Sequence, residues 1–260
     1  MGLLSGRVAI ITGASKGIGR VMSQFFASEG AQVVCVARSD GLVKETAAQI
    51  AQAGGDAIAV TADAAQEGDA RALVDAAIRA FGRVDTLVNN AGDSGPTKPI
   101  QEYSVEEWFY TINSSLTSAY LCTRFAAPSM IASGRGAIVN IASMAGRRGL
   151  PYRVGYCSAK AGQIGMTYGM ALELGPHNIT VNAIAPGAVS GDRIDRVVEA
   201  QAAMRGTSID EMRRTFVERS PLKRMSTPDD IASLAAFLCS DHARNISGQC
   251  IPVTAGEPAS

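Results

Sequence analysis

The sequence predicts an α/β fold with a seven-stranded, mostly parallel sheet that carries helices on both faces. Short apolar, β-branched runs alternate along the chain with longer amphipathic stretches, which is the element order that parallel sheets require. Hydrophobic residues make up 47% of the 260 residues and charged residues 18%, a composition that suits a sheet buried on both faces. A glycine-rich turn follows the first apolar run directly, as in phosphate-binding turns.

The first half of the chain contains four of the expected strands and three of the helices. The strands are short and β-branched, each with a turn signal behind it, and we expect them at residues 7–12, 31–37, 57–60 and 85–88. The helices show apolar residues at helical spacing, and we expect them at residues 20–29, 42–53 and 67–81. Right-handed crossovers between parallel strands then distribute the helices over both faces of the sheet.

The second half continues this alternation and then departs from it. Strands are expected at residues 137–141, 179–184 and 249–253, and a helix rich in Ala and Gly at residues 156–174. Two Ser-x-x-Glu sequences, beginning at Ser104 and Ser208, are typical of capping boxes that open helices. Residues 193–225 hold amphipathic pieces in place of a strand–helix pair, so we expect a helical substrate lid at about 190–225. Because we find no linker or repeat, residues 1–260 are expected to form a single domain.

The composition argues against several classes of function. The formal net charge is zero, so no nucleic-acid-binding surface is expected, and the apolar runs are too short to cross a membrane. The five cysteines are scattered without a C-x-x-C pattern and only two histidines are present, so we expect neither disulfides nor a metal site. The N-terminus leads into a strand without a signal-peptide layout. We therefore expect a cytoplasmic protein whose partner is a small molecule.

The stretch from Ser143 to Lys160 carries the residues with the clearest catalytic chemistry. Tyr156 and Lys160 are four residues apart, so they share one face of a helix, and Ser143 follows a predicted buried strand at its carboxyl end. Free tyrosine has a pKa near ~10, and a neighbouring ammonium favours the phenolate form, which suits proton transfer. A half-buried Tyr beside an exposed Lys would give the same spacing, so this triplet is not decisive by itself.

The turn between the first strand and the first helix is expected to bind phosphates. Gly13, Gly17 and Gly19 have the spacing G-x-x-x-G-x-G, and glycines there let backbone N–H groups approach a pyrophosphate at the positive end of a helix. Arg38 ends the second strand, where dinucleotide folds meet the adenosine ribose, and Lys16 lies in the turn. Both cations favour NADP, with NAD as the second choice. The alternatives for Arg38 are a solvated strand end and stacking on the adenine.

Six short motifs, taken together, resemble those of the short-chain dehydrogenase/reductase family in its single-domain branch. They occur in the family's order and cover nearly the whole chain. The motifs are Thr12-Gly13-Ala14-Ser15-Lys16-Gly17-Ile18-Gly19, Asn89-Asn90-Ala91-Gly92, Asn113, Ser143, Tyr156-x-x-x-Lys160 and Pro186-Gly187. The resemblance implies a doubly wound Rossmann fold, a nicotinamide cofactor and a homotetramer. It also implies hydride transfer between a carbonyl and a secondary alcohol or sugar hemiacetal.

The resemblance also implies catalytic roles for individual residues. Tyr156 would be the acid/base, and Ser143 would hold the substrate oxygen. Lys160 would bind the nicotinamide ribose and favour the Tyr156 phenolate. Asn113 would hold a water that relays protons to Lys160.

Further residues would bind the cofactor. Asp63 would meet the adenine, and Asn90 would support the cofactor through the central strand. The family's Thr after Pro-Gly contacts the nicotinamide, whereas this chain reads Ala-Val-Ser-Gly-Asp at 188–192. Either Ser190 takes that place or the contact is absent. The full expected set is Gly13, Ser15, Lys16, Gly17, Ile18, Gly19, Arg38, Ser39, Asp63, Ala64, Asn90, Ala91, Gly92, Tyr156, Lys160, Pro186, Gly187 and Val189.

Four arginines suggest the charge of the substrate. Arg147, Arg148 and Arg153 lie between the expected catalytic Ser and Tyr, and Arg193 opens the expected lid. Because the guanidinium fork matches carboxylate, sulfonate and phosphate oxygens, we expect a small anionic hydroxy or oxo compound, or an acidic sugar. The alternative is that these arginines face solvent or pair with acids across a subunit contact.

Two other functions remain open at this stage. An acidic acyl-carrier partner would use the same arginines from outside the pocket, so a ketoreductase similar to 3-oxoacyl-acyl-carrier-protein reductase is one alternative. A cofactor-binding redox sensor without turnover is another. Such a sensor would be expected to lose Ser143, Tyr156 or Lys160, and all three are present.

Overall fold

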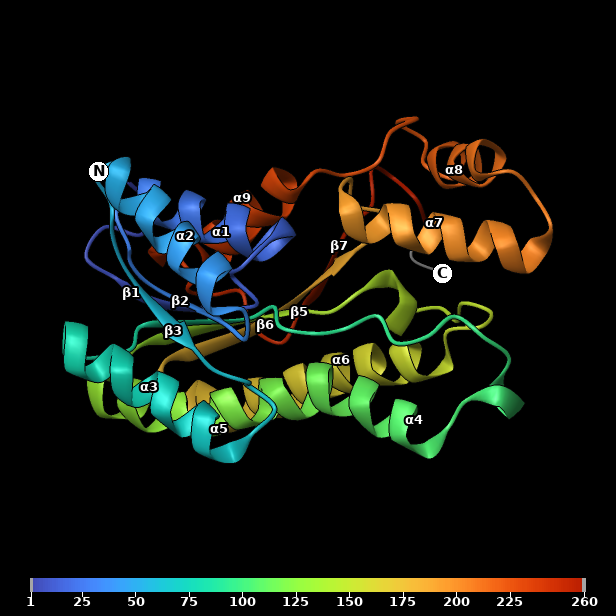
Figure 1. Cartoon of the computed structure of the whole chain (residues 1–260). Coiled ribbons are helices and arrows are strands. Elements are labelled where there is room, and N and C mark those ends of the chain that lie inside the picture. Colours follow the sequence, from blue (N-terminus) through green and yellow to red (C-terminus); the bar gives the residue numbers. More distant parts are fainter. Residues whose placement is uncertain (1, 259–260) are drawn as a thin grey trace.

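The computed structural model describes residues 2–258 and shows a seven-stranded sheet between two layers of helices (Figure 1). The strand order is β3-β2-β1-β4-β5-β6-β7. All neighbouring strands pair in parallel, so the sheet is wholly and not just mostly parallel. The strands are β1 (Val8–Thr12), β2 (Gln32–Ala37), β3 (Asp56–Thr61), β4 (Thr86–Asn89), β5 (Gly136–Ile141), β6 (Ile179–Pro186) and β7 (Cys250–Val253).

Each face of the sheet has its own hydrophobic core. On one face lie α1 (Gly17–Ser28), α2 (Asp40–Gln52) and α9 (Pro228–Leu238), with Phe26 among the buried side chains. On the other face lie α3 (Glu67–Phe81), α5 (Ser118–Ser133) and α6 (Val154–Leu174), with Met130 in the core. Short 3₁₀ turns occupy Ile100–Glu102, Met144–Gly146, Gly175–His177 and Asp241–Ala243. This two-sided burial explains why the strands are continuously apolar.

The fold agrees with the doubly wound arrangement that the sequence predicts. The helix predicted at residues 67–81 has the same bounds in the structure, and the other elements differ by a few residues at their ends. The first helix starts at Gly17 and not at residue 20, because two glycines of the turn already belong to its first turn. Ser104 forms the expected two-way capping box with Glu107, whereas Ser208 caps its helix in one direction only.

A π-helical segment, Asn113–Thr117, joins α4 (Val105–Ile112) to α5. The backbone N–H of Ser118 donates to the carbonyl of Asn113, five residues earlier, so one extra residue is inserted in the helix. Such insertions change which side chains face a neighbouring element. Here the changed face lies against α6, which carries Tyr156 and Lys160.

The segment predicted as a lid contains α7 (Asp192–Arg205) and α8 (Ile209–Glu218). The two helices share a small apolar cluster that includes Val198 and Met212, and Arg213 donates to Asp195 at 2.7 Å. Figure 1 shows them beyond the carboxyl ends of the strands. They therefore stand where a cover over a ligand at this edge would stand.

Three thiols are buried in the two cores. Cys35 and Cys239 belong to the core on the α1 face, and Cys122 belongs to the core on the α5 face. Burial raises the pKa of Cys35 to about 11, and that of Cys122 and of Cys239 to about 12. Cys157 and Cys250 are half-buried, and none of the five is in a disulfide. Within residues 2–258 there is no cluster with metal-ligand geometry and no helix able to span a membrane.

Candidate active site

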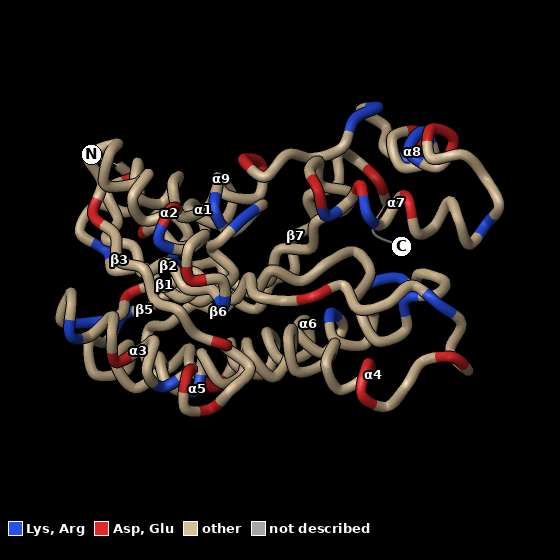
Figure 2. The backbone as a smooth tube through the Cα atoms, in the orientation of Figure 1, with Lys and Arg blue, Asp and Glu red and all other residues tan. Residues whose placement is uncertain are grey.

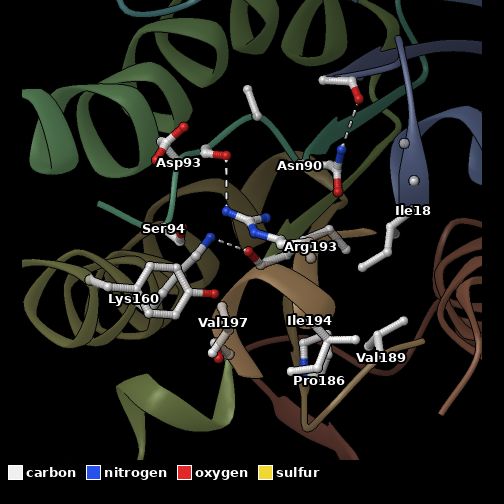
Figure 3. A pocket seen from close by; sticks show the side chains of 18 of the residues that line it. Ile18, Asn90, Asp93, Ser94, Lys160, Pro186, Val189, Arg193, Ile194 and Val197 are labelled. Atoms are coloured by element: carbon white, nitrogen blue, oxygen red, sulfur yellow. Dashed lines mark hydrogen bonds between the residues drawn. The ribbon is translucent and has the colours of Figure 1, made fainter. Parts of the chain in front are cut away.

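A cavity of about 550 Å³ lies at the carboxyl ends of the strands. Its walls come from the turn after β1, the ends of β2, β4, β5 and β6, the start of α6, and α7. Ligands of open parallel sheets bind at this edge, where the strand order reverses. Figure 3 shows Asn90, Lys160, Pro186 and Arg193, which come from four of these regions, around one space.

The glycine turn is shaped for close approach of a phosphate group. Gly13 and Gly17 have φ angles of 71° and 54°, which side chains other than glycine adopt rarely. A Cβ on Gly19 would lie 2.1 Å from the carbonyl oxygen of Gly13, so only glycine lets the helix sit this close to the turn. Lys16 precedes α1 and its side chain makes no capping bond, which leaves the first N–H groups of the helix available to an anion.

Asn90 fastens this turn to the central strands. Its Nδ2 donates to the carbonyl oxygen of Thr12 at 2.9 Å. In return, the hydroxyl of Thr12 accepts from the backbone N–H groups of Asn90 and Ala91, both at 3.0 Å. Asn90 therefore holds the glycine turn against the end of β4.

Every residue of the expected cofactor set lines the cavity. Arg38 is exposed at the end of β2, and its guanidinium donates to the Tyr110 hydroxyl at 3.5 Å. Ser190 also lines the cavity, where its N–H donates to Ser226 at 2.9 Å. The glycine turn, the uncapped helix start and the size of the cavity fit a dinucleotide.

Ser143, Tyr156 and Lys160 meet in this cavity. The Ser143 hydroxyl accepts from the Ala145 N–H at 3.1 Å, which leaves its proton free to be donated. The Lys160 Nζ lies 5.9 Å from the centre of the Tyr156 ring and donates to Ile141 O at 2.7 Å. Burial, with a smaller effect from the Arg193 charge, lowers the pKa of Lys160 to about 7.

The structure does not bring Asn113 to this group. Asn113 is exposed and does not line the cavity, its Oδ1 accepts from Thr117 at 3.0 Å, and its carbonyl accepts from Ser118. Ser115 instead turns its carbonyl toward α6. Ser115 is fully buried whereas Asn113 is exposed, so the two residues face opposite sides of the segment. The relay role expected for Asn113 therefore does not fit its position.

The four arginines differ in their surroundings. The Arg153 and Arg193 guanidiniums lie 4.8 Å and 5.9 Å from the centre of the Tyr156 ring and donate to the carbonyls of Ser94 and Gly92, both at 3.1 Å. Figure 3 shows Arg193 reaching across the cavity. Arg148 lines the cavity but is paired with Glu257, and Arg147 is exposed outside it. Figure 2 shows basic residues on both the chain leading into α6 and on α7.

One residue near the site was not predicted from the sequence. Gln163 is fully buried, and its Oε1 accepts from Lys160 Nζ at 2.8 Å. The available signal was its spacing, three residues after Lys160 and seven after Tyr156, which puts an amide on the same helix face.

The chain matches known proteins over nearly its whole length. A family model described as Enoyl-(Acyl carrier protein) reductase matches residues 13–257. The 7alpha-hydroxysteroid dehydrogenase of Escherichia coli strain K12 is 36% identical over 253 residues, 97% of this chain and 94% of that enzyme. The 3-oxoacyl-acyl-carrier-protein reductase FabG of Staphylococcus aureus is 35% identical over 249 residues, 95% of this chain and 96% of that enzyme.

Solved structures also superpose on this chain over nearly its whole length. An NAD⁺-bound xylitol dehydrogenase superposes with a TM-score of 0.94 at 30% identity, over 97% of this chain and 99% of that one. A 7 alpha-hydroxysteroid dehydrogenase complexed with NADH and 7-oxo glycochenodeoxycholic acid superposes with a TM-score of 0.89 at 35% identity, over 99% of this chain and 96% of that one.

These relatives are dehydrogenases and reductases of alcohols and oxo compounds, and the fold of this chain agrees with that of the solved ones. The chain belongs to the short-chain dehydrogenase/reductase family and is an NAD(P)-dependent oxidoreductase that interconverts an alcohol and a carbonyl by hydride transfer.

Proposed function

We propose that this enzyme interconverts a small anionic hydroxy compound, or an acidic sugar, and the corresponding oxo compound, with NADP as cofactor. The observation that carries the proposal is the position of Arg153. Its side chain is buried against the Tyr156 ring, and its Nε has no hydrogen-bond partner among the described residues. Burial lowers the pKa of Arg153, which means that the guanidinium charge is poorly compensated. An anionic group of the substrate would supply the missing charge and acceptor.

The chain's own residues provide the rest of the reaction. A bound nicotinamide supplies the hydride in reduction and accepts it in oxidation. Tyr156 donates its proton to the forming alkoxide in reduction and takes it back in oxidation, while the Ser143 hydroxyl donates a hydrogen bond to the same oxygen. The Lys160 ammonium lies beside this ring, 5.9 Å from its centre.

Arg193 supports the same assignment from the lid side. Within residues 2–258 no carboxylate forms an ion pair with Arg153 or Arg193, whereas Arg148 has Glu257. Two uncompensated guanidiniums therefore flank the proposed acid/base. The role of α7 and α8 as a cover over the substrate, in a single domain, is part of the proposal.

The test compares matched substrates with and without the anionic group in the parent, Arg153→Gln, Arg153→Lys and Arg193→Gln. Loss of a buried charge pair is expected to lower kcat/KM for the anionic substrate by about 10²-fold, with little effect on the neutral one. Arg153→Lys keeps the charge, so its kcat/KM for the anionic substrate should fall less than that of Arg153→Gln. Arg147→Gln is the control, because Arg147 lies outside the cavity. Equal kcat/KM for both substrates in the parent would contradict the anionic substrate.

A ketoreductase acting on acyl-carrier thioesters is the second candidate. The observation in its favour is the 35% identity to a 3-oxoacyl-acyl-carrier-protein reductase over nearly the full length of both chains. A short 3-oxoacyl thioester should be included in the substrate panel, attached to carrier protein and as a free thioester. A strong preference for the carrier-bound form would favour this candidate over a free small anion.

The preference for NADP rests on Arg38 and Lys16, which line the cavity where the adenosine ribose is expected. Charge-assisted bonds to a 2′-phosphate would favour NADP, and Arg38→Asp should shift the ratio of kcat/KM values toward NAD. The two solved relatives hold NAD⁺ and NADH, so a parent enzyme that prefers NAD would remove this part of the proposal.

A cytoplasmic homotetramer is the proposed working form. Several apolar side chains on α4, α5 and α6 are exposed in one chain, among them Val105, Phe109 and Leu172, the last at 82%. Exposed apolar surface of this kind is typical of subunit contacts. The five free thiols suit a reducing compartment. Light scattering of the purified protein measures the oligomeric state, and a monomer at working concentration would contradict it.

A further inference from the structure

A buried amide connects Lys160 to the bend between α4 and α5. Gln163 lies on α6, one turn after Lys160, with none of its surface exposed. Its Oε1 accepts from Lys160 Nζ at 2.8 Å, and its Nε2 donates to the carbonyl of Ser115 at 3.0 Å. The side chain thus bridges the ammonium to the π-helical segment through two hydrogen bonds.

The bridge is part of a buried polar region in an otherwise apolar interface. The Thr167 hydroxyl donates to the Gln163 carbonyl at 2.8 Å and accepts from Asn140 at 2.9 Å. Burying an amide lowers stability unless its donors and acceptors are used, and an apolar side chain of the same size would pack at this position without that requirement. The presence of an amide at position 163 is therefore best explained by its hydrogen bond with the Lys160 ammonium.

We propose that Gln163 is a positioning residue that holds the Lys160 ammonium in its working place by bridging it to the backbone carbonyl of Ser115. An ammonium has three donors. Ile141 O and Gln163 Oε1 take two of them, which leaves the third for a group in the cavity that Lys160 lines. The consequence for turnover rests on the proposed role of Lys160, whereas the bridge itself does not.

The charges around Lys160 show why a neutral acceptor matters. Arg193 on α7 and Arg153 before α6 bring positive charge, and Tyr156 on the same helix presents its ring. Within residues 2–258 no carboxylate pairs with Lys160, so Ile141 and Gln163 are the acceptors that hold it. With one of two acceptors removed, the buried ammonium should lose its proton more easily, in line with the direction in which burial already acts.

The test measures the ionisation of Lys160 directly. Lysine occurs at only five positions, Lys16, Lys44, Lys98, Lys160 and Lys223, so the ¹³Cε resonances of protein labelled with [¹³C]lysine can be followed by NMR during a pH titration. A Lys160→Arg variant assigns the resonance. In Gln163→Met, which keeps the unbranched shape but removes the acceptor, the Lys160 midpoint should fall by about one pH unit or more.

Two further variants separate this role from a structural one. Gln163→Glu keeps an acceptor of the same length, so its midpoint should stay at the parent value or rise. Thr167→Val removes a buried hydrogen bond one turn further along α6 without touching Lys160, so it should lower the unfolding temperature but leave the midpoint unchanged. A Lys160 midpoint in Gln163→Met and in Gln163→Leu that equals the parent's would overturn the proposal.

The kinetic measurement distinguishes this proposal from the proposed function. In Gln163→Met kcat should fall about tenfold, and Gln163→Glu should retain more activity than Gln163→Met. If Tyr156→Phe stays as active as the parent, the proposed catalytic assignment is wrong, yet the NMR titration still decides whether Gln163 holds Lys160. If Tyr156→Phe is inactive while Gln163→Met matches the parent in both midpoint and kcat, the inference about Gln163 alone is wrong.

Discussion

Lys160 carries its ammonium into the protein interior, where backbone and amide oxygens are its only acceptors among the described residues. An ion buried without a counter-ion destabilises the fold relative to an apolar side chain. The nearby guanidinium of Arg193 adds repulsion. The charged form of Lys160 therefore lowers the stability of the fold, a cost that is common at functional sites.

This arrangement predicts a pH dependence of stability. The pKa of Lys160 in the folded protein is about 7, below the value near ~10.4 of an unfolded lysine, so unfolding takes up a proton between the two values. The free energy of unfolding should therefore decrease as pH falls from about 10 to about 7, by up to about 1.4 kcal/mol per pH unit.

Lys160→Met should flatten this slope, while the exposed Lys44→Met should retain it. Urea unfolding at several pH values in this window measures the effect. Parallel curves for the parent and Lys160→Met would show that the ammonium is not destabilised in the folded state.

At the residue scale, the sequence could identify several side chains of the candidate site but not the residues that they contact on other elements. Ser143, Tyr156 and Lys160 were found because strand ends and helix spacing determine where they lie. The position expected for Asn113, near Lys160, was wrong because a π-helical insertion decides which residue faces α6. The sequence does not reveal such an insertion. Gln163 was missed for a related reason, since its partner Ser115 is distant in sequence.

At the scale of elements, the glycine turn and α1 act as one unit. Gly19 packs against the carbonyl of Gly13, and Asn90 binds the same turn from β4. The start of α1 can lie this close to the end of β1 because Gly19 has no side chain. Any atom added there must push the start of α1 away from the turn.

Gly19→Ala should therefore weaken cofactor binding. The new Cβ would lie 2.1 Å from the Gly13 oxygen and 2.6 Å from Asn90 Nδ2, so the backbone has to shift, and the KM for the cofactor should rise at least about tenfold. Gly41→Ala is the matched control, because a Cβ on this glycine of α2 meets nothing within 4 Å and should stabilise the helix slightly. Fluorescence titration with NADPH compares the two, and equal affinities would contradict the argument.

The helices and strands themselves were largely predictable, because the sequence patterns that indicate them are local. Strands appeared as β-branched runs and helices as apolar periodicity, and the structure has every one of them, most with ends shifted by a few residues. The lid segment was recognised only by its departure from alternation. Its packing through Met212 and its ion pair between Asp195 and Arg213 depend on tertiary contacts that no periodicity encodes.

At the scale of the whole molecule, the parallel sheet collects distant residues at one edge. Because all strands run in the same direction, the turn at Gly13, the strand end at Ser143 and the start of α7 at Arg193 open onto one cavity. The Arg193 bond to Gly92 joins α7 to the loop after β4. The residues proposed for cofactor binding, proton transfer and substrate binding are thus brought together from distant parts of the sequence.

The rate at which each buried thiol is alkylated measures how often the core on its face of the sheet opens to solvent. Cys35 and Cys239 report on one core and Cys122 on the other, and protonated, buried thiols do not react with iodoacetamide until water reaches them. The strands are shared by both cores, so we expect the three to be alkylated at one common rate, long after Cys157 and Cys250. Mass spectrometry of timed digests follows each thiol separately. Faster alkylation of Cys122 would instead mean that the α5 face opens while the glycine turn on the other face stays closed, and the two layers would then be separate folding units.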